Sequence, residues 1–278
     1  MNLTLLFWLD ASLIFLAWLL CVLAFYRQHH GIHHYGERLL FLGLTLQLLY
    51  IVAAHVELGL NPFDSLAGLF LFGSLLVLLV YFTLDFYFSN RIFEVIFPPL
   101  TLFCMMLSLL LAGQDIATSG FLLGAPVFGK LILVVHAGLT MLGYLLFGVA
   151  CLTSIYFLRE ESLIKQHSIH LMRNKGPSLG FLDRLNHGVI ATGFLAITIG
   201  LLVGIAMKII THEGANALSW RQGLPFAAWA VYAGFLLDRS LQGLSLKSSA
   251  LWAICGFFVV AASFAYEINY LLTHLPQP

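Results

Sequence analysis

Charged residues are scarce in this sequence. Asp, Glu, Lys and Arg together make up only 9% of its 278 residues, whereas an ordinary soluble domain contains about 25%. Hydrophobic residues make up 60% of the chain and aromatic residues 14%. This composition excludes a soluble globular protein and indicates one that lies in a lipid bilayer.

The sequence also lacks an excess of either charge and any cysteine motif. Its 13 Lys and Arg residues balance 13 Asp and Glu residues, so no basic stripe is present for nucleic acid and no acidic tail for a cationic partner. We therefore expect no nucleic-acid binding. The four cysteines lie in separate apolar runs without a C-x-x-C pattern, which favours small buried residues over disulfides or reactive thiols.

Eight long apolar runs remain, and each is long enough to cross a bilayer as a helix, which takes about 20 residues. We predict an all-α, polytopic integral membrane protein with eight transmembrane helices, forming a single membrane domain over residues 1–278. The predicted spans are about 3–26, 39–58, 66–88, 93–112, 129–158, 186–209, 222–237 and 248–272.

The distribution of cations predicts the orientation of these spans. With the N-terminus outside, ten of the 13 Lys and Arg residues fall on the inner side, as the positive-inside rule requires. We therefore expect both termini outside (N-out/C-out), in the periplasm or at the cell exterior, and the longest loop, 159–184, in the cytoplasm. Arg27 follows the first apolar run, which is the reverse of a cleavable signal peptide, so we expect that helix to be retained.

Three histidines are predicted at the outer ends of helices. His136 lies near the start of the fifth span on a small, weakly polar face, while His55 ends the second span and His274 ends the eighth. An imidazole near hydrocarbon is costly unless it is paired or binds a metal. Two such histidines would suit the axial positions of a haem iron. The alternatives are a hydrogen bond from His136 to a carbonyl group and a frayed C-terminus at His274.

A further group of histidines, at 29–34, resembles a metal cluster. Gly31 interrupts it, and no cysteine or carboxylate pattern accompanies it. We therefore expect a solvated loop there and treat a metal site as the alternative.

Two local patterns predict structure. Asp64 or Ser65 is expected to cap the helix that follows the second outer connection. Gly193, Gly200 and Gly204 are expected to let a neighbouring helix approach the sixth span closely.

Four stretches, taken in order, resemble the cytochrome c assembly protein family, which includes haem-handling subunits of cytochrome c biogenesis and HemX-type proteins of haem biosynthesis. They are NPFDSLAGLFLF at 61–72, HAGLTMLGYLLFGVACLTSIYFL at 136–158, LDRLNHGVIATGFLAITIGLLVGIA at 182–206 and WAVYAGFLLDRSLQG at 229–243. The resemblance covers the chain from about residue 55 to its end.

This resemblance implies a b-type haem at the outer face. It implies iron ligation by His136, with His274 or His55 as the second ligand. The family's tryptophan-rich motif reads WDPKE in its core, and here only Arg221 keeps a matching cation, in the lysine position. The chain therefore resembles a short HemX-type protein, or another short inner-membrane relative, more than a complete haem-to-cytochrome ligase, which implies a location in a bacterial inner membrane. Trp220 and Trp229 would stack on the haem ring and Arg221 would bind a propionate, although Trp220 and Arg221 would equally suit an interfacial loop.

We thus expect a non-catalytic protein that holds haem, with cytochrome c biogenesis or haem-biosynthesis proteins as partners. One rival is a scaffold or regulator that never binds haem and docks a cytoplasmic enzyme through the loop 159–184. A transporter ranks third, since no broken half-helices repeat in the two halves of the chain. No nucleophile and base, phosphate loop or carboxylate pair indicates an enzyme.

Overall fold

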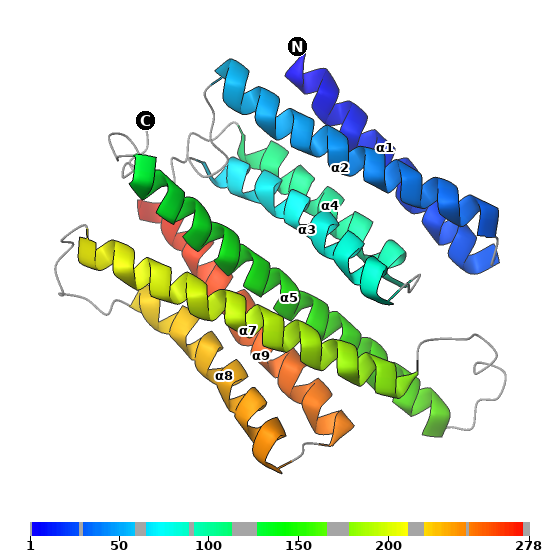
Figure 1. Ribbon diagram of the computed structural model, residues 1–278, viewed down its shortest axis with the longest axis vertical. Coiled ribbons are helices and arrows are strands. Elements are labelled where there is room, and N and C mark those ends of the chain that lie inside the picture. The colour runs from blue at the N-terminus through cyan, green and yellow to red at the C-terminus, as the bar shows by residue number, and fades with distance from the viewer. Residues whose placement is uncertain are drawn as a thin grey trace. The chain divides into compact units, whose positions relative to one another are not determined.

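The computed structural model describes residues 2–27, 30–58, 65–88, 92–112, 127–165, 178–210, 220–242 and 245–274. These residues form eight helices (Figure 1), which confirms the all-α fold. The helices are α1 (Leu3–Arg27), α2 (His30–Leu58), α3 (Leu66–Phe88), α4 (Ile92–Leu111), α5 (Val127–Lys165), α7 (Leu179–Ile210), α8 (Trp220–Gln242) and α9 (Leu246–His274).

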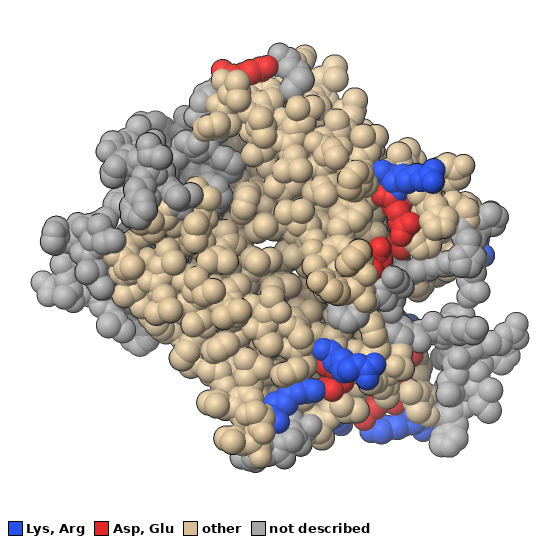
Figure 2. Space-filling model, in the orientation of Figure 1, with Lys and Arg blue, Asp and Glu red and all other residues tan. Residues whose placement is uncertain are grey.

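Seven of these eight helices are long and apolar enough to cross a membrane. The exception is α8, whose first and last turns carry polar and charged residues. Large hydrophobic side chains such as Val56 and Phe86 are exposed on the surface, as expected where side chains face lipid. Figure 2 shows broad areas of the described surface with neither acidic nor basic side chains. The prediction of a polytopic membrane protein is confirmed.

The structure extends the predicted helices into predicted loops, as the end of α5 and the start of α7 show. α5 continues to Lys165, which pairs with Glu161 one turn earlier at 2.7 Å, and such i,i+4 pairs stabilise helices. α7 begins at Leu179, where the Ser178 hydroxyl accepts a hydrogen bond from the amide of Phe181. The connection predicted at 159–184 is therefore shorter, and its residues 166–177 lie outside the described residues.

The N-cap predicted at the start of α3 is confirmed. The amide of Gly68 donates a hydrogen bond to the Ser65 hydroxyl at 3.0 Å, so Ser65 is the N-cap of α3. Asp64, the other candidate, lies outside the described residues.

The chain divides into two compact units, an N-terminal unit of α1 to α4 and a C-terminal unit of α5 to α9. In the N-terminal unit, α1 packs on α2 and α4, and α3 packs on α4. A buried hydrogen bond from Gln47 to Ser74 joins α2 to α3. The prediction of a single membrane domain stays a prediction.

In the C-terminal unit, α5 packs on α7 and α9, and α8 packs on α9 and α7. Its core contains the buried rings of Phe147 and Tyr232, which stack with their planes at 10°. The Tyr232 hydroxyl donates a hydrogen bond to the carbonyl oxygen of Ala253 at 3.3 Å. This bond satisfies the phenol inside an otherwise apolar core.

Candidate functional site

The His136 imidazole, near the start of α5, is anchored on α7. Its Nδ1 lies 2.7 Å from the carbonyl oxygen of Gly200. Because a carbonyl oxygen only accepts hydrogen bonds, Nδ1 carries the proton in this contact. The neutral imidazole therefore keeps its lone pair on Nε2, the atom that is then free to bind a metal. The hydrogen bond to a carbonyl group, which the sequence offered as the alternative to iron ligation, is thus present. It is also compatible with ligation, because histidines that bind metals commonly have their other ring nitrogen held in this way.

Glycines on α7 provide the space for this imidazole. A Cβ on Gly204 would lie 2.7 Å from Cε1 and 3.0 Å from Nδ1 of His136. One turn earlier, a Cβ on Gly200 would lie 2.8 Å from the hydroxyl of Thr140, which donates a hydrogen bond to the His136 carbonyl oxygen. Gly193 similarly lies against a neighbouring side chain of α5. The predicted close approach at these glycines is confirmed, and it restricts the orientation of the ring.

The end of α9 lies at the same end of the C-terminal unit as His136. α9 runs antiparallel to α5, as two contacts show. Tyr144 of α5 lies against Phe264 of α9, and Gly148, one turn later on α5, lies against Phe257, which comes earlier on α9. At 1.5 Å of rise per residue, His136 is level with about residue 272 of α9. His274, the last residue of α9, therefore shares this end, although its side chain lies outside the described residues.

The start of α8 lies at this end as well. α8 runs antiparallel to α7, as two contacts show: Asp183 with Arg239, and Thr198 with Trp229. Trp220 and Arg221, the first two residues of α8, are therefore near the last turns of α7, beyond Gly204. The fold thus brings four of the predicted site residues to one end of the unit. The side chains of Trp220 and Arg221 lie outside the described residues.

Trp229 packs against a different face of α7 from His136. Its indole nitrogen donates a hydrogen bond to the Thr198 hydroxyl at 2.9 Å, and its ring stacks on Phe194 with centroids 5.5 Å apart. Successive residues of a helix are rotated by about 100°, so Thr198 and Gly200 point in nearly opposite directions. The structure therefore does not bring Trp229 into contact with His136.

His55 lies in the N-terminal unit. It occupies the last turn of α2, and its side chain is exposed. Because His55 and His136 belong to different units, a pairing between them stays a prediction.

The sequence analysis did not predict the contact between Arg239 and Asp183. Arg239 of α8 forms two hydrogen bonds with the carboxylate of Asp183 on α7, at 2.9 and 2.7 Å, and a third with Ser249 on α9. A signal for this pair was present, because Asp183 lies at the start of α7 and the oppositely charged Arg239 at the end of α8, which follows α7 and runs antiparallel to it. This contact lies at the end of the unit away from His136, where it joins three helices.

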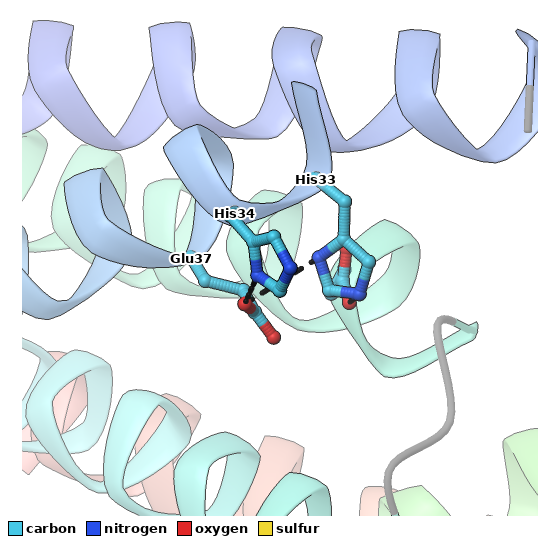
Figure 3. A network of polar contacts seen from close by, with 4 residues as sticks. His33, His34 and Glu37 are labelled. Atoms are coloured by element: carbon cyan, nitrogen blue, oxygen red, sulfur yellow. Dashed lines mark hydrogen bonds and ion pairs between the residues drawn. The ribbon is translucent and has the colours of Figure 1, made fainter. Parts of the chain in front are cut away.

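The prediction of a solvated loop at 29–34 is wrong for the described part of that stretch. α2 begins at His30 and continues through Gly31, and His33 contacts the buried carboxylate of Glu94 on α4 at 3.2 Å. Figure 3 shows His33 and His34 beside Glu37, their neighbour on the same helix. Glu37 lies one turn after His33 on α2, and Glu94 lies on α4. The spacing of the histidines alone therefore did not reveal these contacts.

Comparison with known proteins identifies the family of the chain. The profile of the family described as Cytochrome C assembly protein matches residues 63–271, about three quarters of the sequence. The chain belongs to the cytochrome c assembly protein family. The matched range contains His136, Trp220, Arg221 and Trp229, whereas His55 precedes it and His274 follows it.

Similar relatives are cytochrome c biogenesis proteins CcsA. That of Prochlorococcus marinus strain MIT 9515 is 27% identical over 254 residues, which cover 84% of this chain and 78% of the relative. That of Chlorella vulgaris is 25% identical over 264 residues, covering 83% and 80% of the two chains. No solved structure matches significantly. Membership of the HemX-type group within the cytochrome c assembly family stays a prediction.

Proposed function

We propose that this member of the cytochrome c assembly family binds haem at the His136 end of its C-terminal unit and holds it for cytochrome c assembly or haem homeostasis. The observation that carries the proposal is the hydrogen bond from Nδ1 of His136 to Gly200. This bond fixes the tautomer whose Nε2 is a haem-iron ligand. The glycines beneath the ring keep the imidazole in place before any ligand arrives.

The second axial ligand in this proposal is His274, which ends α9 at the same end of the unit, with His55 as the alternative. The macrocycle is apolar and carries two propionates, so its site needs aromatic contacts and a cation. Trp220 and Arg221 at the start of α8 would provide both. Trp229 is less suited than Trp220 to stack on the haem ring, since its own ring already packs on Phe194.

The haem in this proposal is b-type, because the sequence contains no C-x-x-C-H motif for covalent attachment. Bound iron would supply any redox chemistry. The chain's own groups bind the haem, orient it and shield one face of it from water, and we assign no catalytic residue.

The cation distribution supports a site on the outer side of the membrane, with both termini outside. In this orientation the His136 end of α5 faces away from the cytoplasm. We propose a location in a bacterial inner membrane, with cytochrome c biogenesis or haem-biosynthesis proteins as partners.

Haem titration of the detergent-solubilised protein tests the proposal. The wild-type protein should develop a Soret band that saturates with haem, and the His136→Ala variant should bind haem at least ten times more weakly. His187→Ala is the control, since His187 is an exposed histidine on α7 that lies near Asp183, at the other end of the unit from His136. It should bind like the wild type. A Soret band that His136→Ala and His187→Ala leave equally unchanged would refute the site.

A further inference from the structure

The N-terminal unit contains a second group of ligand-type side chains, at the end where α1 and α3 finish and α2 and α4 begin. One carboxylate oxygen from each of Glu37, Asp85 and Glu94 lies within 4.8 Å of the other two. These residues come from α2, α3 and α4, and Glu94 is only 1% exposed. The group is therefore built by three consecutive helices.

An imidazole joins two of these carboxylates. His33 places Nε2 3.2 Å from Oε1 of Glu94 and Nδ1 3.5 Å from Oε2 of Glu37, and its side chain is 13% exposed. His34 stacks on His33 and also reaches Glu37, but its side chain is 67% exposed (Figure 3). The group thus consists of the His33 imidazole, the buried carboxylate of Glu94 and the half-buried carboxylates of Glu37 and Asp85.

Two further polar groups face this cluster from the protein interior. Tyr81 is fully buried, and among the described residues its hydroxyl has no hydrogen-bond partner. It is close enough to Glu94 and Asp85 to interact with both electrostatically. The thiol of Cys21, also fully buried, is close enough to Glu94 to interact with it electrostatically. A buried phenol that lacks a partner indicates that a further polar species belongs in this place.

The electrostatics of the group favour a cation. Three carboxylates this close together in a largely buried environment cannot all be ionised unless positive charge accompanies them. Imidazole nitrogen and carboxylate oxygen together are common ligands of zinc, iron and manganese. A single protonated His33 would supply one positive charge, whereas a divalent ion supplies two and accepts ligands from all three helices.

The spacing of the group suits such an ion. Ligand atoms about 2.1 Å from a tetrahedral Zn²⁺ are about 3.4 Å from one another. The contact of 3.2 Å between His33 and Glu94 already has this spacing. The carboxylate oxygens lie at most 4.8 Å apart, so they would have to approach one another by at most about 1.4 Å to reach the spacing of zinc ligands. Rotation of their side chains can supply this movement.

We propose that His33, Glu37, Asp85 and Glu94 form a binding site for a first-row divalent metal ion, such as Zn²⁺, that links the ends of α2, α3 and α4. This site is independent of the proposed haem site, which lies in the other unit and uses other residues. The orientation expected from the cation distribution would place the metal site toward the cytoplasm.

Zn²⁺ binding to the full-length, chelator-treated protein in detergent tests the proposal, measured by equilibrium dialysis or calorimetry. Glu94→Gln and Asp85→Asn each keep the shape of the side chain but remove a charged ligand, and each should weaken Zn²⁺ binding at least tenfold. Glu161→Gln removes a carboxylate that pairs with Lys165 on α5 and should leave binding unchanged. His136→Ala should also leave it unchanged, which separates this result from any failure of the haem proposal.

The two histidines distinguish a buried site from surface chelation. His33→Ala should weaken Zn²⁺ binding at least tenfold, whereas His34→Ala should change it less than threefold. If His34→Ala abolishes binding while Glu94→Gln and Asp85→Asn do not, the ion is held at the surface and the proposal is wrong. Equal binding by every variant, or no binding by the wild type, would also overturn it.

Co²⁺ provides a readout that does not depend on one variant folding correctly. In the wild-type protein it should produce the visible absorption of a tetrahedral or five-coordinate site, and Zn²⁺ should remove that absorption. A spectrum no different from that of aqueous Co²⁺ would contradict the proposed ligands, whatever the behaviour of the variants.

Discussion

Replacement of Gly204 by alanine tests the packing that holds His136. The new Cβ would lie 2.7 Å from Cε1 of His136, whereas carbon atoms in ordinary contact are about 3.5–4.0 Å apart. The imidazole must therefore move by about 0.8 Å or more. Its hydrogen bond to Gly200, now 2.7 Å long, would be stretched or broken.

The expected cost follows from these contacts. Overpacking costs about 1–3 kcal/mol and the loss of the hydrogen bond about 1 kcal/mol. Alanine recovers up to about 1 kcal/mol through its higher helix propensity. We therefore expect Gly204→Ala to lower stability by about 1–3 kcal/mol and to weaken haem binding about tenfold, which corresponds to about 1.4 kcal/mol.

Gly188→Ala is the matched control on the same helix. A Cβ at Gly188 meets no atom within 4 Å, so this variant should be neutral or more stable by up to about 1 kcal/mol. The assays are thermal unfolding in detergent, followed by circular dichroism, and haem titration followed by absorbance. If the Gly204→Ala and Gly188→Ala variants have the same Tm and the same haem affinity, the proposed packing of His136 is wrong.

Two further predictions follow from the contacts of the C-terminal unit. Asp183→Asn removes the charge that pairs with Arg239 and should lower stability by about 1–3 kcal/mol; a Tm equal to that of the wild type would contradict a structural role for this pair. Trp229→Phe keeps an aromatic ring on Phe194 but removes the hydrogen bond to Thr198, so thermal unfolding should show a loss of about 1 kcal/mol and haem titration only a small change.

The helices could be predicted from the sequence because a bilayer demands long apolar segments with internally bonded backbones. The run at 66–88 was predicted with the bounds that α3 has in the structure. The ends of α2 and α5 were harder, because they continue past the apolar segments as polar helices. Pairs such as Glu161 with Lys165 stabilise those extensions, and hydropathy does not detect them.

The site could be predicted only in part. His136 and the glycines of α7 were identified from residue type and spacing. The contact of His136 with the Gly200 carbonyl depends on how two helices are rotated against each other, and a residue pattern along one helix does not contain that information. The same reason explains why the contact between His33 and Glu94 was missed, since its two residues come from different helices and the histidines were expected in a loop.

The central claim is that Nε2 of His136 is a ligand of haem iron, and replacement of this side chain by free imidazole tests it most directly. The His136→Gly variant, saturated with haem, should lose the visible and electron paramagnetic resonance spectrum of two-imidazole ligation. Imidazole added to the solution should then restore that spectrum, because it can occupy the space that the side chain has left. A His136→Gly variant with the wild-type spectrum before any imidazole is added would contradict the claim.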